Sequence, residues 1–324
     1  MGNEYQIRAK NIHKNALFID ACGASVIDER YAERMVNAGL TAQCVTIGSN
    51  ENYREAGEIL AKWNRKLKRL SQYFVPVLDA SSVKKAKAAG KVGVIYFLQN
   101  IGPIEDEIGF VDLLHKMGVR VIQLTYNERN LAADGCQEPQ NAGLSDFGVR
   151  LIKEMNEVGI LLDLSHVGNQ STIEAIEVST KPMVISHSNC RSLCDTPRNV
   201  TDQVIKNLAK KGGVIGINAY PGCVSKKADK TIEDYLAHID YVVQLVGIDH
   251  VGIGLDLIDG HVKEDYTLET GEIGHGAPYK PDVYPPWPWI YPEGIQIVDD
   301  LPNITAGLVK RGYKENIKGL WGRT

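Results

Sequence analysis

Two histidines and an aspartate stand where apolar stretches of the sequence end. His166 and His187 each follow an apolar run and each lies beside a serine, and Asp256 closes a third run further along the chain. Imidazole nitrogens and carboxylate oxygens are ligands that zinc and similar divalent ions accept. A second role is open to Asp256, that of general base toward a metal-activated water. The three residues therefore predict a metal or catalytic site, provided that the fold brings them together.

The elements that would carry these residues are eight short apolar segments separated by amphipathic stretches. Near-continuous apolar runs are typical of strands that are covered on both faces, as in parallel sheets. Eight strands, each followed by a helix, predict an α/β fold, the (β/α)8 TIM barrel, and a doubly wound open sheet is the alternative. No Gly-rich phosphate loop follows the first segment, which weighs against a dinucleotide-binding fold. The predicted strands are 16–21, 41–47, 92–98, 119–126, 159–166, 181–188, 212–220 and 250–257.

Three of the intervening stretches have helical patterns that end on glycine, which predicts helices over 82–90, 144–159 and 231–247. A length of 324 residues would admit two domains. Barrels commonly run to about 250 residues as one unit, however, so we predict a single barrel domain over 1–324.

In a barrel, the residues at the carboxyl ends of the strands converge on one mouth. The polar residues that end the apolar runs should therefore form a cluster and not a scatter. They are Asp20, Cys22, Gln99, Asn100, Tyr126, Asn127, Asp163, His166, His187, Asn218 and Asp256.

The stretch 261–292 departs from this pattern. It ends in "PYKPDVYPPWPWIYP", where six prolines interleaved with Tyr and Trp exclude a helix or a central strand. Long irregular loops inside compact domains are usually functional, and this loop would lie at the mouth of the barrel. We predict a lid or a subunit contact, with an inert structural loop as the alternative.

Composition narrows the class of partner. The 36 basic and 40 acidic residues are scattered, with a formal net charge of -4 and no polybasic block for nucleic acid or an anionic membrane. We therefore expect a small-molecule partner, no nucleic acid, and assembly into a homo-oligomer.

Composition and the amino terminus also bear on location. The amino terminus lacks the apolar core of a secretory signal, and no apolar run approaches the roughly 18 residues of a membrane span. The six cysteines make no dense disulfide framework in a chain of this length. These features predict a cytoplasmic protein with reduced, mostly buried thiols and no membrane span.

Arg198 lies in a polar turn, "CDTPRNVTD" (194–202). An arginine placed there can clamp a substrate carboxylate through two parallel hydrogen bonds. It can equally cap the next helix, and the local sequence leaves both interpretations open.

With these residues in view, the chain resembles the membrane (renal) dipeptidase family of zinc metallopeptidases, which belongs to the metal-dependent amidohydrolase barrels. The resemblance runs from about Ile12 to the end of the chain. The segments that carry it are 154–168, 181–202, 251–260 and 300–313.

The resemblance implies a role for each matching residue. His166 and His187 match the two strand-end histidines that bind the second metal of that family. Arg198 matches the arginine that holds the dipeptide carboxylate, and Asp256 matches the aspartate that positions the attacking water. The reaction implied is hydrolysis of a dipeptide by a hydroxide between two zinc ions.

This sequence also departs from the family at the first metal. The His-x-Asp pair of the first strand is replaced by Cys22 and Ala24, and the glutamate that bridges both metals by Gln99. Tyr126 stands where a histidine polarises the substrate carbonyl. A neutral amide or an alanine cannot offset cationic charge as a carboxylate does, so we predict that the first metal site is absent. The pattern resembles a bacterial branch of the family with an altered metal site.

The chain also ends in "IKGLWGRT" (317–324), sooner than the final helix of that family, which suggests a shortened carboxyl terminus.

Three functions follow from these residues. The first is a metal-dependent hydrolase of a dipeptide or a similar small C–N bond, with at most one zinc or other divalent ion. The second is an enzyme of changed chemistry on a small carboxylate, with Arg198 binding the anion and Tyr126 as acid or base. The third is a catalytically silent barrel that binds a small ligand or a partner. The metal itself is one ion at most, and the protein could also bind none. The residues assigned are His166, His187, Cys22 and Gln99 as metal ligands, Asp256 and Tyr126 as catalytic residues, and Arg198 and Asn127 as substrate-binding residues.

Overall fold

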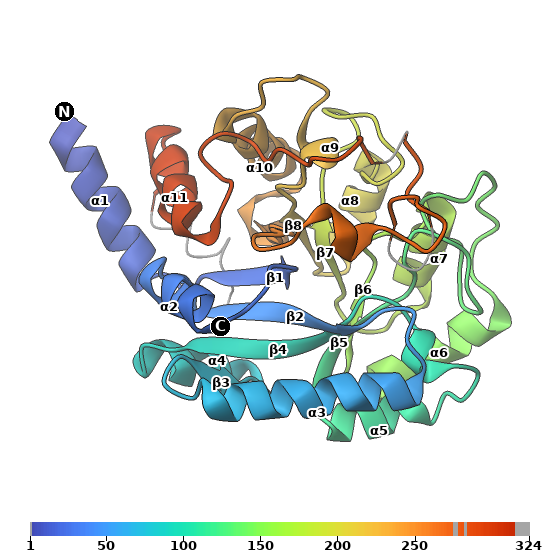
Figure 1. Cartoon of the computed structure of the whole chain (residues 1–324). Helices are drawn as coiled ribbons and strands as arrows, with labels where there is room; N and C mark the ends of the chain where they lie inside the picture. Colours follow the sequence, from blue (N-terminus) through green and yellow to red (C-terminus); the bar gives the residue numbers. More distant parts are fainter. Residues whose placement is uncertain (1, 275–277, 282–283, 315–324) are drawn as a thin grey trace.

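The structure is a computed structural model that describes residues 2–274, 278–281 and 284–314, and its centre is a nine-stranded sheet. Eight strands pair in parallel in chain order, and a bridge from Gly23 to Leu257 brings the two edges together, so that the sheet forms a nearly closed barrel (Figure 1). The predicted TIM barrel is confirmed. Its strands are β1 (Ile19–Gly23), β2 (Ala42–Gly48), β4 (Val92–Leu98), β5 (Val119–Gln123), β6 (Leu161–Asp163), β7 (Val184–Ser188), β8 (Val214–Ile217) and β9 (Val251–Ile253).

Each of these eight strands overlaps a predicted one, but a ninth strand was missed. Strand β3 (Phe74–Pro76) pairs only with the first residues of β4, ahead of the point where β5 begins to pair. A three-residue edge strand that ends in proline carries too little hydrophobic pattern to stand out.

Helices cover the outside of the barrel, and the three predicted helices are confirmed to within two residues at each end. Most begin at a side chain that accepts a backbone N–H, such as Asp28, Asn52, Asp79, Ser145 and Thr231. The α-helices are α1 (Gly2–Asn15), α2 (Glu29–Asn37), α3 (Tyr53–Arg69), α4 (Ala80–Ala88), α5 (Phe110–Lys116), α6 (Asp146–Val158), α7 (Asn169–Val178), α8 (Asp202–Lys210), α9 (Pro221–Val224), α10 (Ile232–Val246) and α11 (Leu301–Lys310). Short 3-10 turns occur at Gly102–Ile104, Ile248–His250, Lys263–Tyr266 and Val298–Asp300.

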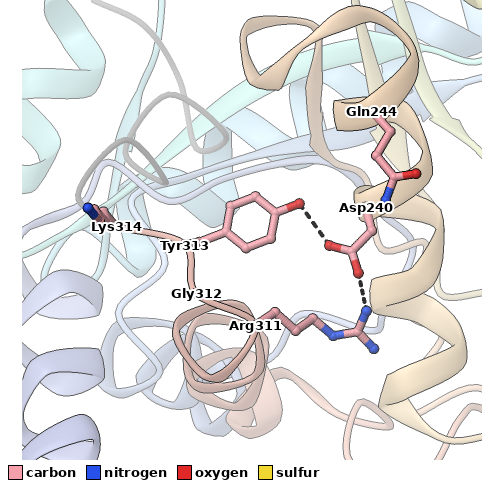
Figure 2. A pocket seen from close by; sticks show the side chains of 6 residues that line it. All are labelled: Asp240, Gln244, Arg311, Gly312, Tyr313 and Lys314. Atoms are coloured by element: carbon pink, nitrogen blue, oxygen red, sulfur yellow. Dashed lines mark hydrogen bonds and ion pairs between the residues drawn. The ribbon is translucent and has the colours of Figure 1, made fainter.

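Helix α11 completes the ring and packs against α1 and α10 (Figure 1). Figure 2 shows how its end is attached, with Arg311 and the hydroxyl of Tyr313 both directed at the carboxylate of Asp240 on α10. The ending 317–324 lies outside the described residues. No helix among the described residues has the length and hydropathy of a membrane span, and all six cysteines are buried thiols.

A buried carboxylate holds the seam where the barrel closes. Asp20 on β1 accepts hydrogen bonds from the backbone N–H of Leu255 at 2.8 Å and from the side chain of Gln43 at 2.9 Å. Burial raises the pKa of Asp20 to about 7. Asp20, predicted as part of the polar mouth, therefore joins β1, β2 and the segment after β9.

Two glycines allow the backbones of β7, β8 and β9 to approach closely. A Cβ atom on Gly216 would lie 2.0 Å from the carbonyl oxygen of Ser186, and one on Gly254 would lie 1.8 Å from the same atom. Because the obstacle is backbone and not a flexible side chain, the strands would have to move apart. These glycines thus keep β7 and the residue that follows Ser186 in place.

We expect Gly254→Ala to lower the free energy of unfolding by about 3 kcal/mol or more, since the added methyl overpacks a backbone contact. Thermal or urea unfolding followed by circular dichroism measures the change. The matched control is Gly57→Ala inside α3, where nothing lies within 4 Å of the new methyl. That substitution should stabilise the protein by roughly 0.5 to 1 kcal/mol. Equal stability of the two variants would contradict the close approach.

Candidate active site

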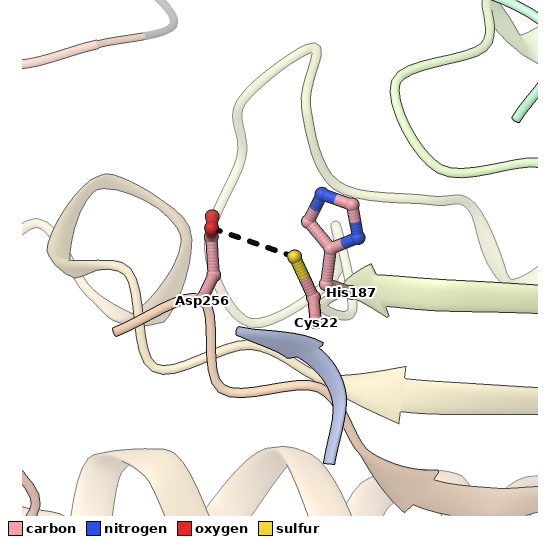
Figure 3. A group of neighbouring side chains, drawn as sticks. All are labelled: Cys22, His187 and Asp256. Atoms are coloured by element: carbon pink, nitrogen blue, oxygen red, sulfur yellow. Dashed lines mark hydrogen bonds between the residues drawn. The ribbon is translucent and has the colours of Figure 1, made fainter. Parts of the chain in front are cut away.

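Three ligand-type side chains meet at the mouth of the barrel. Cys22 comes from the end of β1, His187 from β7 and Asp256 from the loop after β9, and one donor atom of each lies within 4.8 Å of the other two (Figure 3). In Figure 3 the thiol of Cys22 stands between the other two side chains. The predicted convergence of strand ends therefore occurs, and Asp256 joins the group of candidate ligands.

His187 is held through its Nδ1, which leaves Nε2 facing the mouth and His166. Its Nδ1 lies 2.6 Å from the Ser186 hydroxyl, which donates to Asp163 Oδ2 at 2.6 Å. Because a hydroxyl has one proton and Ser186 gives it to the carboxylate, Nδ1 of His187 carries a hydrogen and Nε2 keeps its lone pair. Burial lowers the pKa of His187 well below its usual value, so the ring is neutral. A neutral imidazole with a free Nε2 is the form that binds a metal ion.

His166 presents the same nitrogen from the segment after β6. Its Nδ1 lies 2.7 Å from Asn127 Oδ1, an oxygen that can only accept, so Nδ1 carries the hydrogen in this amide orientation. The two Nε2 atoms of His166 and His187 are 2.9 Å apart. Lone pairs that face each other at this distance repel unless a cation lies beside them. The pair therefore fits a metal ion, although His166 lies outside the group of three donors.

The thiol of Cys22 has two polar neighbours. It lies 3.6 Å from Asp256 Oδ1, and the side-chain N–H of Gln99 points at the sulfur from 3.2 Å. Burial, and then the Asp256 carboxylate, raise the pKa of Cys22 well above its usual value. A cation bound at the same place would favour the thiolate instead. Gln99, predicted as a ligand, presents its nitrogen and not its oxygen to this group.

Asp256 is buried deeply enough to change its acidity. Burial raises its pKa to about 6, against the opposing effects of Arg198 and of a 3.4 Å hydrogen bond from Asn218. The hydroxyl of Tyr291 donates to its backbone carbonyl. Asp256 therefore has one oxygen near Cys22 and the other near Asn218.

Backbone strain is concentrated at this mouth. Asn127, His166 and Asp256 have φ angles of 62°, 62° and 55°, and among the described non-glycine residues only Glu105 shares this sign. Such conformations cost of order 1 to 3 kcal/mol each and are typical of functional sites. The strain sets the direction in which all three side chains leave the backbone.

Arg198 lies beneath the mouth with an unused donor. It is 3% exposed, its Nη2 donates to the carbonyl of His187 at 2.7 Å, and its Nη1 has no hydrogen-bond partner among the described residues. Helix α8 is capped by Thr201, so the interpretation of Arg198 as a helix cap is wrong. A buried guanidinium with a spare N–H suits the carboxylate of a ligand.

The predicted lid covers this region. The Tyr279 and Tyr126 hydroxyls are 2.8 Å apart, and the Tyr284 hydroxyl donates to Asn127 at 3.1 Å. Burial raises the pKa of Tyr126 well above its usual value, so its phenol keeps its proton. Tyr126 is therefore able to donate a hydrogen bond but unable to act as a base.

A cavity of about 200 Å³ lies between the lid and the barrel and is lined by Gln99, Tyr126, His166 and Asp256. Two larger hollows, of about 660 and 820 Å³, lie on the outside of the barrel and are lined by none of these residues. The smaller cavity is the candidate active site, because Asp256 of the donor group and the neighbouring His166 line it.

Similarity to known proteins decides the family. The sequence model of the membrane dipeptidase family, peptidase family M19, matches residues 12–269. The chain belongs to this family. Members of the membrane dipeptidase family are thus the relevant comparison, and the resemblance predicted from the residues is confirmed.

Individual proteins of known name or structure are similar to this chain. A dipeptidase of Clonostachys rogersoniana is 33% identical over 262 residues, which make up 79% of this chain and 59% of that protein. An amidohydrolase from Pseudomonas aeruginosa superposes with a TM-score of 0.90 at 33% identity, over 97% of this chain and 95% of that one. A metallopeptidase from Rhodobacter sphaeroides, liganded with a phosphinate mimic of L-Ala-D-Ala, shares the fold, with a TM-score of 0.75 at 20% identity over 99% and 93% of the two chains. The chain spans little more than half the length of the curated relatives it matches.

The hydroxyl of Ser186 can be tested as a positioning group. We expect Ser186→Ala to weaken zinc binding by roughly 10- to 100-fold, because the link from Asp163 that orients His187 is lost. Competition with a chromogenic chelator measures the affinity. Ser179→Ala removes another buried hydroxyl, which lies at the end of α7 and donates to Asn156, and should leave zinc affinity unchanged. Equal affinities in the two variants would show that Ser186 does not orient the ligand.

Proposed function

We propose that this protein is a metal-dependent hydrolase that cleaves the amide bond of a dipeptide or a similarly small substrate, using one divalent ion. The observation that carries the proposal is the group formed by Cys22, His187 and Asp256 at the mouth of the barrel, with donor atoms within 4.8 Å of one another. Membership of the membrane dipeptidase family supports it.

The donor set fits one borderline-soft ion such as zinc. A thiolate, an imidazole and a carboxylate are all accepted zinc ligands, and a site with three protein ligands leaves a position open for catalysis. A divalent ion held there would supply a Lewis acid that polarises an amide carbonyl and acidifies water. Among the described residues no second group of three such donors occurs, and at the place of the first metal Ala24 offers no side-chain ligand and Gln99 is neutral.

Residues of the chain would bind the substrate, accept a proton and exclude water. Arg198 would hold the substrate carboxylate through its unused Nη1. Asp256 would accept the proton of the attacking water through the carboxylate oxygen that lies near Asn218 and away from Cys22. Tyr126, as a neutral phenol, would donate a hydrogen bond to the substrate carbonyl. The lid tyrosines would exclude bulk water from the cavity.

The test begins with protein purified without chelator. Elemental analysis should find one metal per chain, and a panel of dipeptides, including some with a D-residue at the carboxyl end, should include a substrate. Absence of metal together with no gain of activity on adding zinc or manganese would overturn the proposal.

Cobalt substitution tests the sulfur ligand without relying on activity. The Co(II) protein should show a near-ultraviolet sulfur-to-cobalt charge-transfer band, which Cys22→Ala should abolish. Cys44→Ala is the matched control, because Cys44 is also buried and packs in the same cluster of side chains but lies outside the donor group. A band that survives Cys22→Ala would place the ion elsewhere.

A second candidate is changed chemistry on a small carboxylate, favoured by the replacements at Ala24, Gln99 and Tyr126. Full metal content with no hydrolysis across the panel would support it over peptidase activity.

A homo-oligomer in the cytoplasm stays a prediction from the sequence, and light scattering of the purified chain measures the assembly.

A further inference from the structure

The wall of the active-site cavity is unusually rich in aromatic rings. Four of them come from the lid and two from the ends of barrel strands. Neighbouring rings are in contact, with centroids 4.1 Å apart for Tyr279 and Tyr284 and 5.3 Å apart for Tyr220 and Trp289. The six rings, called here the aromatic box, are Tyr126, Tyr220, Tyr266, Tyr279, Tyr284 and Trp289.

The charged side chains that line the same cavity are acidic. Asp256 and Asp265 contribute carboxylates, and no lysine or arginine lines the cavity among the described residues. Asp265 is held on the lid by His261, whose Nδ1 is 2.9 Å from its carboxylate and whose Nε2 is 2.8 Å from the carbonyl of Ala24. The part of the cavity next to the lid is thus an environment for a cation, whereas Arg198, which does not line the cavity, stays the partner for a carboxylate.

The balance of rings and acceptors indicates what kind of cation fits. A primary ammonium has three N–H groups to satisfy, and aromatic faces are weak partners for them. An alkylated ammonium makes no such demand, and its diffuse charge is attracted to the faces of Trp and Tyr, most strongly where water is excluded. Tyr220, Tyr284 and Trp289 are 4%, 8% and 7% exposed, so this wall is well desolvated.

We propose that the aromatic box and the carboxylate of Asp265 select substrates whose amino end carries an N-methylated or trimethylated ammonium group. This inference rests on the proposed function, in which Arg198 takes the carboxylate at the other end of the substrate. The substrate class is then a small zwitterion with a charged alkylammonium at one end, a carboxylate at the other and an amide bond between them.

The first experiment measures binding and needs no turnover. Isothermal titration calorimetry of the full chain compares choline, a quaternary ammonium alcohol, with 3,3-dimethyl-1-butanol, its neutral isostere. Choline should bind at least about tenfold more tightly, because only the cation gains from the ring faces. Equal affinity for the two probes, or no binding of either, overturns the inference.

Variants locate the binding to the box. Trp289→Leu and Tyr266→Leu should each reduce choline affinity several-fold, and Asp265→Asn should reduce it while leaving the affinity for the isostere unchanged. The matched control is Trp63→Leu on α3, where the ring packs against Tyr96 and Lys66 away from the cavity. Two box variants are used so that one poorly folded protein does not decide the outcome. Unchanged choline affinity in both folded box variants overturns the inference.

The second experiment separates this inference from the proposed function. A dipeptide with a trimethylated amino end should be hydrolysed with a higher kcat/KM than the same dipeptide with a free amine. Choline binding without any hydrolysis would contradict only the proposed function. Hydrolysis with equal or lower kcat/KM for the methylated dipeptide would contradict only the aromatic box as a selector of alkylammonium groups.

Discussion

Asp256→Asn is expected to lower kcat by roughly 10²- to 10⁴-fold, since the variant loses the general base. The amide has nearly the shape of the carboxylate and can still meet the side chain of Asn218. The fold should therefore be kept, and the melting temperature should change little. Steady-state hydrolysis at saturating zinc measures the effect. Saturating zinc is used because the Asp256 carboxylate is also a candidate ligand, and a loss of zinc would otherwise lower kcat as well.

A carboxylate three residues further along provides the control. Asp259 forms an ion pair with Arg34 at 2.9 Å, and it does not line the active-site cavity. Asp259→Asn should leave kcat within about twofold of the unaltered protein, because its partly exposed ion pair with Arg34 lies outside the candidate site. If Asp256→Asn retains the same kcat as Asp259→Asn, the base must be sought elsewhere.

The barrel was predictable because its cause is visible in the sequence. Strands that are buried on both faces must be apolar throughout, so all eight barrel strands appear as apolar runs. The mouth was predictable for a related reason. A polar residue such as His187 or Asp256 is tolerated at the end of a buried strand only where the strand reaches the open end of the barrel.

The side-chain arrangement at the mouth depends on causes that a sequence does not display. The positive φ angles at His166 and Asp256 arise from the packed fold, and they decide where these side chains point. The link from Asp163 through Ser186 to His187 depends on rotamers. Asp163 was expected only as one of the polar residues at the mouth, and nothing in its spacing reveals that it orients a histidine.

The lid, too, was predictable only in part. Its proline content predicted an irregular loop, but not that Tyr279 and Tyr284 reach Tyr126 and Asn127 across the mouth. Those contacts join residues more than 150 positions apart. The local sequence pattern does not reveal contacts between residues so far apart in the chain. The closed barrel brings them together, because it places the loop after the last strand beside the loop after β5.

Charge explains why one ion fits the altered mouth. A divalent ion would meet two negative ligands, the Cys22 thiolate and the Asp256 carboxylate, and the neutral His187. That combination cancels the charge of one ion and leaves none for a second. In this interpretation Cys22 is a replacement ligand and not merely the loss of a histidine, which is why sulfur-specific spectroscopy is the decisive measurement.

Arg198→Met is expected to raise KM by about 100-fold with a smaller change in kcat, because the substrate carboxylate loses its charge-assisted contact with a desolvated guanidinium. The Nη1 atom available for this contact is buried and has no partner among the described residues. Arg198→Lys should restore only part of the affinity, since an ammonium does not have the fixed planar donors of a guanidinium. Inhibition by the free amino acid product should weaken in parallel with KM, which ties the effect to carboxylate binding.

Arg191→Met separates a binding role from a structural one. Arg191 lies in the same turn and is half-buried, and its guanidinium donates to the carbonyls of Pro197 and Asn199 at 2.9 Å. Its loss should lower the melting temperature without raising KM, because its donors are already used by the protein. Arg198 also donates to the carbonyl of His187, so Arg198→Met should cost some stability as well. Comparing the change in KM with the change in melting temperature therefore separates the two roles. If both variants lose stability and neither changes KM, Arg198 supports the backbone of His187 and the substrate carboxylate binds elsewhere.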